Sequence, residues 1–141
     1  MMPSRRDQRG TNVGRHVDST KPIIFVVDDD PAVRNSLKFA LEIEGYRVRL
    51  CADASALLRS VDLPRSQCLV IDLKLPGTDG LDLLAELRRR NIMAPAVLIT
   101  SHPPRSIRER AARDGVPIIE KPLLGNALSD SIRDAIAASP G

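Results

Sequence analysis

Residues 23–34, IIFVVDDDPAVR, contain the pattern that decides the fold. The first five residues, IIFVV, are apolar and mostly β-branched, which is typical of a strand buried on both faces of a sheet. Asp30 is a suitable helix N-cap and Pro31 fits the first helical position, so a helix is predicted to begin directly after the strand. Gly45 can end this helix in a left-handed conformation.

The same order of strand and helix repeats along the rest of the chain. Apolar runs or period-two patterns predict further strands at residues 46–51, 68–72, 96–100 and 118–120. Apolar residues at helical spacing predict helices at residues 53–61, 81–90, 103–114 and 124–138. This alternation is typical of a parallel sheet with helices on both faces, so the sequence predicts an α/β fold with five strands and five helices.

The length of 141 residues fits one domain and excludes a second. Residues 22–138 are predicted to fold, residues 1–21 to be a disordered polar and basic tail, and residues 139–141 a short tail. No apolar run approaches the ~18 residues that span a bilayer. The three aromatic residues are too few for a nucleic-acid stacking surface. We therefore expect neither a membrane partner nor direct nucleic-acid binding.

Cysteine usage indicates a reducing compartment. Cys51 and Cys68 lie in different predicted strands and lack CxxC spacing. We expect two buried, reduced thiols in a cytoplasmic protein, with neither a disulfide nor a zinc site.

Polar side chains follow the buried strands at the point where each strand ends. Asp28 and Asp29 follow the first strand, Asp72 ends the third, Thr100 ends the fourth, and Lys121 follows the fifth. Parallel strands bring their carboxyl ends to one edge of the sheet, where ligands bind in such folds. Clustered carboxylates repel one another unless a cation lies between them, and carboxylate oxygens favour Mg²⁺. The residues therefore predict a metal-assisted phosphoryl site.

Three other acids near this edge have structural explanations. Asp30 and Asp79 each precede a predicted helix, where a carboxylate caps the free backbone N–H groups. Asp82 is expected to be a solvated acid in the first turn of its helix.

The complete pattern resembles the receiver domains of two-component response regulators. The resemblance covers residues 22–138 and rests on four segments: VVDDDPAVR, VIDLKLPGTDGLDLL, LITS and IIEKPL. It implies a flavodoxin-like, doubly wound sheet with strand order 2-1-3-4-5. It also implies a cis peptide bond between Lys121 and Pro122.

The resemblance implies a role for each site residue. Asp72 would be the phosphoacceptor, and Mg²⁺ would be held by Asp29, Asp72 and the backbone carbonyl of Lys74, with Asp28 acting through a bound water. Thr100 would shift to hydrogen-bond a phosphoryl oxygen, with Ser101 beside it, and Lys121 would pair with the phosphoryl group.

Three positions set this sequence apart within the family pattern. Ile118 stands where the family usually has a Tyr or Phe that moves with the threonine, so a ring-based readout does not carry over. Lys74 and His102 occupy the positions that flank the approach of the hydrolytic water. We expect them to prolong the lifetime of the aspartyl phosphate.

The function expected from this resemblance is that of a single-domain response regulator. It would receive its phosphoryl group from a sensor histidine kinase or a histidine phosphotransfer protein. It would signal by binding an output protein at the face formed by residues 104–138, since no residues follow Gly141 to form an output domain. It would not be an enzyme, apart from catalysing its own aspartyl phosphorylation and dephosphorylation.

Two other classes of protein remain alternatives. A haloacid-dehalogenase-type phosphatase also has an aspartate nucleophile after a buried strand, but the acidic motif expected after Lys121 is missing. A receiver-like module that binds partners without being phosphorylated is disfavoured, because the acids, the threonine and the lysine are all present.

Overall fold

The computed structural model of the chain describes residues 21–139, so the predicted tails lie almost entirely outside the described residues. The strands of the main sheet are β2 (Ile23–Val27), β3 (Arg47–Cys51), β4 (Ser66–Asp72), β7 (Ala96–Thr100) and β8 (Ile118–Glu120). Apolar runs form most of the main sheet, and the edge strand β3 instead alternates apolar residues with arginines. The helices are α2 (Pro31–Ile43), α3 (Ala54–Leu58), α4 (Gly80–Arg89), α5 (Arg105–Arg113) and α6 (Ala127–Ala138), with a short 3₁₀ turn at Leu63–Arg65.

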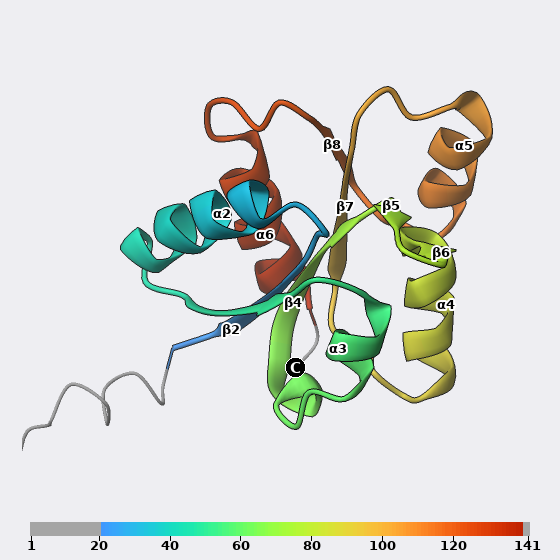
Figure 1. Cartoon of the computed structure of the whole chain (residues 1–141). Helices are drawn as coiled ribbons and strands as arrows, with labels where there is room; N and C mark the ends of the chain where they lie inside the picture. Colours follow the sequence, from blue (N-terminus) through green and yellow to red (C-terminus); the bar gives the residue numbers. More distant parts are fainter. Residues whose placement is uncertain (1–20, 140–141) are drawn as a thin grey trace, which may run out of the picture.

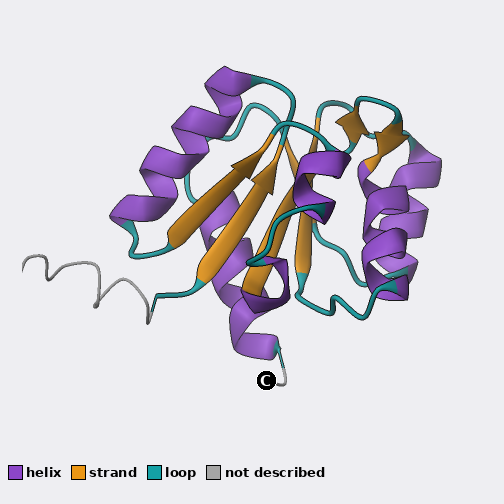
Figure 2. Ribbon diagram, turned by 60° about the horizontal axis from the view of Figure 1, so that its bottom comes forward, coloured by secondary structure: helices purple, strands orange, loops and turns teal. Residues whose placement is uncertain are grey.

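The five strands form one parallel sheet in the order β3-β2-β4-β7-β8. Counted along the chain, this is the order 2-1-3-4-5, so the predicted topology is confirmed. All the strands run in the same direction, and their carboxyl ends meet at one edge of the sheet (Figure 2).

Helices cover both faces of the sheet, with α2 and α6 on one face and α3, α4 and α5 on the other (Figure 1). Successive residues of β2 serve opposite faces, as the period of a strand requires. Ile23, Phe25 and Val27 belong to one apolar cluster, whereas Ile24 and Val26 belong to the other. This double burial explains why the central strands are uninterrupted apolar runs.

The predicted helix caps are present. The Asp30 side chain accepts a hydrogen bond from the backbone N–H of Ala32, and the Asp79 side chain accepts one from Asp82. Gly45 follows α2 with a φ of 99°, a left-handed conformation that glycine adopts without strain. Asp30 and Asp79 thus mark the starts of the two helices that follow the acidic strand ends.

Three local features differ from the sequence prediction. The predicted loop after β4 contains a hairpin of β5 (Lys74–Leu75) and β6 (Thr78–Asp79), turned by Pro76 and Gly77. The helix predicted at 53–61 is shorter, since α3 ends at Leu58. The last helix begins at Ala127 rather than at residue 124, because Gly125 has a left-handed φ of 67° that a helix cannot include.

Both cysteines are buried free thiols, as predicted. They lie on β3 and β4, on opposite sides of β2. Burial raises the pKa of the Cys68 thiol to about 12 and also raises that of Cys51, so both are protonated near neutral pH. Among residues 21–139, no helix has both the length and the apolar character needed to cross a membrane.

Candidate functional site

The carboxyl edge of the sheet brings together the residues that the sequence predicted. Asp28 follows β2, Asp72 ends β4, and Lys121 follows β8. The Lys121 Nζ atom lies 3.0 Å from Asp28 Oδ2 and 3.1 Å from Asp72 Oδ2. One ammonium therefore bridges two carboxylates from different strands. The peptide bond between Lys121 and Pro122 is cis, as the resemblance implied.

Asp28 is completely buried, and each of its polar groups has a partner. Its backbone N–H donates to the Cys51 carbonyl, and its own carbonyl accepts from Arg34 Nη1 at 2.7 Å. Its Oδ1 atom accepts from the Asp30 N–H at 2.9 Å, and its Oδ2 atom accepts from Lys121. Both carboxylate oxygens are thus already engaged within the protein.

Asp29 is different, because its side chain is exposed and makes no hydrogen bond to any described residue. Carboxylate oxygens of Asp28, Asp29 and Asp72 nevertheless all lie within 4.8 Å of one another. These hard oxygen donors fit Mg²⁺, which takes a few carboxylates and keeps several of its waters. Asp29 and Asp72 could hold such an ion directly, with Asp28 beside them.

Asp72 lies at the centre of this arrangement and is nearly buried. Its Oδ1 atom accepts a hydrogen bond from the backbone N–H of Lys74 at 3.3 Å. Burial raises the pKa of the Asp72 carboxyl, and the nearby Asp28 carboxylate adds to this rise against the opposing effect of Lys121. Burial alone would lower the pKa of Lys121, but its hydrogen bonds to Asp28 and Asp72 raise it overall. Lys121 therefore carries a full positive charge at neutral pH.

Replacing Asp72 by asparagine is expected to stabilise the metal-free protein at neutral pH. The raised pKa means that the ionised carboxylate is less favourable in the folded than in the unfolded chain, so its effect on stability worsens as pH rises. The variant leaves Lys121 paired with Asp28 alone. Urea unfolding in EDTA at pH 7 should show a higher free energy of unfolding for the variant. This difference should shrink as the pH falls towards 4, and an unchanged difference would contradict the explanation.

Thr100 and its neighbours lie beside this carboxylate pair. Thr100 ends β7 and is 1% exposed, and its backbone carbonyl accepts a hydrogen bond from the Lys121 N–H at 2.8 Å. Its hydroxyl is 3.4 Å from the Ser101 carbonyl, a long contact that leaves it free to turn. Ser101 and His102 are exposed, and His102 adopts a left-handed φ of 46°.

Two predicted positions remain, Lys74 and Ile118. Lys74 is exposed on the hairpin that follows Asp72. Ile118 begins β8, pairs with Leu98 of β7, and packs against the apolar cluster beneath α5. Its side chain is thus partly buried against the core and lines the groove described below.

Sequence reasoning missed two residues that shape the site. A Cβ atom placed on Gly80 would lie 2.6 Å from the Asp72 carbonyl oxygen and 2.9 Å from Leu98 Cδ1. Glycine thus lets the start of α4 lie directly against the end of β4. Arg34, in the first turns of α2, holds the Asp28 carbonyl. The glycine at the start of a predicted helix could have indicated close packing there. Nothing in the sequence indicated the hydrogen bond of Arg34.

Three of the arginines of α5 pair with carboxylates. Arg108 Nη2 pairs with Glu120 of β8 at 2.6 Å, and Arg110 Nη2 pairs with Asp82 of α4 at 2.8 Å. Arg105 lies 3.6 Å from Glu109. Carboxylates of neighbouring elements, which sequence spacing does not reveal, thus pair with two of these arginines.

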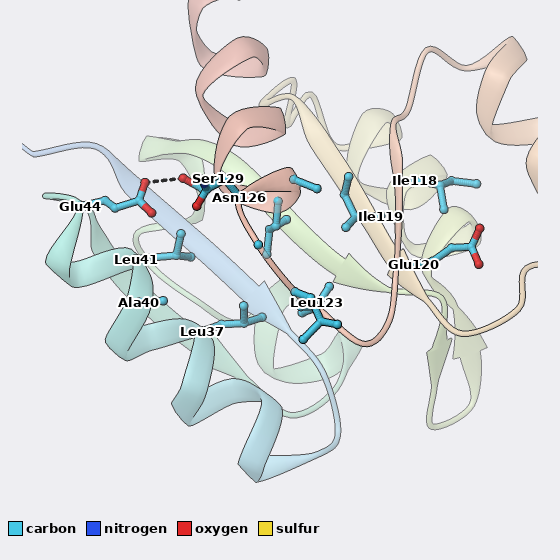
Figure 3. A pocket seen from close by; sticks show the side chains of 14 residues that line it. Leu37, Ala40, Leu41, Glu44, Ile118, Ile119, Glu120, Leu123, Asn126 and Ser129 are labelled. Atoms are coloured by element: carbon cyan, nitrogen blue, oxygen red, sulfur yellow. Dashed lines mark hydrogen bonds between the residues drawn. The ribbon is translucent and has the colours of Figure 1, made fainter.

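A groove of about 460 Å³ borders the face formed by residues 104–138 (Figure 3). Leu37 and Leu41 line it from α2, and Leu123 lines it from the segment between β8 and α6. The Ser129 hydroxyl donates a hydrogen bond to Glu44 across one end of the groove. This face therefore includes an apolar recess with a polar rim.

Comparison with protein families assigns this arrangement to a known class. The family described as the response regulator receiver domain matches residues 24–133, which is most of the chain. The chain belongs to the response regulator receiver domain family. It is therefore a component of two-component signalling, and the predicted family and fold are both confirmed.

Relatives of this receiver domain include longer regulators. Nodulation protein W of Bradyrhizobium diazoefficiens is 38% identical over 133 residues, which cover 93% of this chain and 58% of the relative. The transcriptional regulatory protein FixJ of the same organism is 35% identical over 119 residues, covering 84% of this chain and 58% of that protein. The receiver domain thus spans less than two thirds of these relatives.

Solved structures share its architecture. The crystal structure of FixJ-N is 30% identical, has a TM-score of 0.74, and covers 86% of this chain and 98% of that one. The non-phosphorylated HemR receiver domain from Leptospira biflexa is 25% identical and has a TM-score of 0.77, and the match covers 86% of this chain and 98% of that one.

Proposed function

We propose that this receiver domain accepts a phosphoryl group on Asp72 in a Mg²⁺-dependent reaction. The donor would be a sensor histidine kinase or a histidine phosphotransfer protein. The observation that carries the proposal is the position of Asp72. It ends a buried strand within 4.8 Å of the Asp29 carboxylate and 3.1 Å from the Lys121 ammonium. A free carboxylate on one side and a fixed cation on the other suit the transfer of a charged group.

The residues would divide the work of transfer among them. An Asp72 carboxylate oxygen forms a bond to phosphorus while the bond from phosphorus to the donor's imidazole nitrogen breaks, and that nitrogen keeps the electron pair. Asp29, Asp72 and the Lys74 carbonyl would hold Mg²⁺, with Asp28 beside them, and the ion would supply positive charge for the phosphoryl oxygens. Lys121 pairs with one of these oxygens in exchange for part of its present contact with Asp72. Thr100, with Ser101 beside it, supplies a hydroxyl to another.

In this proposal the protein does not transfer the phosphoryl group to another molecule as an enzyme would. The chain would catalyse only the phosphorylation and dephosphorylation of its own aspartate. The dehalogenase-type alternative would instead use Asp28 as nucleophile. Both carboxylate oxygens of Asp28 are already hydrogen-bonded, which argues against that use.

The direct test uses acetyl phosphate as a small-molecule donor. The purified chain is incubated with the donor in Mg²⁺ or in EDTA, and its intact mass is then measured. A mass increase of one phosphoryl group that requires Mg²⁺ supports the proposal. The proposal would be contradicted if the mass of this chain did not increase while a known receiver domain was labelled under the same conditions.

Lys74 and His102 would extend the lifetime of the phosphorylated state. Both side chains are exposed, Lys74 on the hairpin that follows Asp72 and His102 two residues beyond Thr100. Neither is a carboxylate or an amide, the groups suited to orienting a nucleophilic water. A separate phosphatase, or return of the phosphoryl group to a histidine, would then end the signal.

The output of the phosphorylated chain would be binding of a partner protein at the face formed by residues 104–138. The α5 helix has the weakest attachment to the core, with Ala111 buried and Ile107 half-buried. A change at Thr100 reaches α5 and β8 through the Lys121 backbone and the Arg108–Glu120 pair. The apolar groove beside β8 offers this partner a recess.

Hydrogen exchange is expected to locate this response. In the presence of Mg²⁺ and beryllium fluoride, a phosphoryl analogue, amide exchange should change severalfold in residues 104–120. Weakly packed elements open at low free-energy cost, so they respond first. The α3 helix at Ala54–Leu58 serves as the internal control. Changes confined to α3 would show that the proposed output face is wrong.

A further inference from the structure

Arg34 makes an unusual contact for an arginine near the start of a helix. Its side chain turns back from α2 and donates from Nη1 to the carbonyl of Asp28 at 2.7 Å, six residues earlier in the chain. The side chain is half-buried. Within residues 21–139 the structure gives Arg34 no salt bridge to a carboxylate, so this bond to the backbone is its polar contact.

The position of that carbonyl gives the bond its importance. The Asp28 carbonyl and the Asp29 N–H belong to one planar peptide unit, so a donor that fixes the carbonyl fixes the plane. The orientation of this plane sets the direction in which the Asp29 side chain leaves the backbone. Hydrogen bonds from a charged donor are short and strong, as the 2.7 Å distance indicates.

Asp29 depends on its backbone more than the other two acids do. Asp28 and Asp72 are buried and held by Lys121, but the Asp29 side chain is exposed and has no hydrogen-bond partner among the described residues. Only the course of the main chain keeps its carboxylate within 4.8 Å of the others. The group that fixes this course therefore also fixes the geometry of the acidic cluster.

We propose that Arg34 is a positioning residue for the divalent cation, acting through the Asp28–Asp29 peptide to hold the Asp29 carboxylate in place. The proposal rests on the proposed function for its cation. In many metal sites, residues that do not touch the metal orient its ligands through hydrogen bonds. Arg34 would have this role for Asp29.

Electrostatics alone predicts the opposite effect, which makes the role measurable. Arg34 is a positive charge near three carboxylates, so its removal should strengthen Mg²⁺ binding if charge alone mattered. If Arg34 acts by positioning Asp29, its removal should weaken Mg²⁺ binding. The sign of the change therefore distinguishes the two roles.

The test compares wild type with Arg34→Gln, Arg34→Lys and the control Arg133→Gln. Arg133 is exposed on α6, where it pairs with Asp130, and it lies on a helix that contributes no acid to the cluster. Urea unfolding of the full chain at several Mg²⁺ concentrations gives the dissociation constant, because stability rises with ligand as RT ln(1 + [L]/Kd). This measurement requires no phosphorylation.

We expect the dissociation constant for Mg²⁺ to rise about tenfold in Arg34→Gln, as it does when other residues that orient metal ligands are replaced. Arg34→Lys, which keeps a donor, should rise less, and Arg133→Gln should match wild type. In labelling with acetyl phosphate, Arg34→Gln should need more Mg²⁺ for half-maximal rate yet reach the wild-type rate at saturating Mg²⁺.

Two results would overturn the proposal and are distinguishable. A lower stability of Arg34→Gln with an unchanged or smaller dissociation constant would show that Arg34 acts only on folding or through its charge. If Mg²⁺ does not stabilise even wild type, the cation of the proposed function fails together with this inference. If Arg34→Gln does not fold, the dissociation constant of Arg34→Lys is compared with that of wild type instead, and a smaller rise is expected.

Discussion

The Asp72→Asn variant is expected to lose phosphoryl labelling completely while remaining folded. Asparagine has nearly the same shape as aspartate but offers no carboxylate oxygen to form the bond to phosphorus. The remaining acids cannot replace it. Asp28 has both oxygens engaged, and Asp29 lacks the contact with Lys121 that Asp72 has. The measurement is the intact mass after incubation with acetyl phosphate and Mg²⁺.

The matched control for this experiment is Asp82→Asn. Asp82 is an exposed acid on α4 that pairs with Arg110, so its loss should leave labelling unchanged. Peptide mapping should place the wild-type phosphoryl group on Asp72. Full labelling of Asp72→Asn, mapped to Asp28, would instead favour the phosphatase-like mechanism.

The Gly80→Ala variant is expected to be the most destabilising single-methyl change near the site. The added Cβ would lie 2.6 Å from the Asp72 carbonyl oxygen and within 3.0 Å of two apolar side-chain atoms. The backbone atom cannot move without shifting β4 or α4, whose first N–H donates to the Leu73 carbonyl at 2.7 Å. Overpacking typically costs about 1–3 kcal/mol, and contact with a backbone oxygen places this variant at the upper end. Urea unfolding measures the loss.

Gly125→Ala separates this collision from ordinary glycine strain. Gly125 has a left-handed φ of 67°, but no atom lies within 4 Å of the position that its Cβ would take. Its replacement should cost only about 1 kcal/mol, from the backbone conformation alone. Equal losses in the two variants would show that α4 can move away from β4, contrary to the close packing described above.

The strands and the set of candidate site residues were readable from the sequence because burial on both faces leaves a strong signal. The segments IIFVV and AVLIT coincide with β2 and β7, and the acids that follow the first run cannot be explained as core residues. The strand order and the role of Asp72 came from the family resemblance. Neither follows from periodicity.

The features that the sequence did not reveal are contacts between distant residues. Arg34 looks like any helical arginine until the Asp28 carbonyl lies beside it. The arginines of α5 read as free charge because Asp82 and Glu120 belong to other elements. The hairpin at residues 74–79 is too short to produce a strand pattern, and a turn was the correct expectation for its centre at Pro76 and Gly77.

The bridge made by Lys121 has a consequence for the chain as it is synthesised. Lys121 is 93 residues beyond Asp28 and 49 beyond Asp72. At typical translation speeds, roughly 5–20 s separate the appearance of Asp28 from that of Lys121. Throughout that interval the nascent polypeptide carries the acids without the ammonium that neutralises them. The interior strand β2 is made first, yet the site beside it is completed only by one of the last segments made, so a prematurely terminated product lacks the complete site.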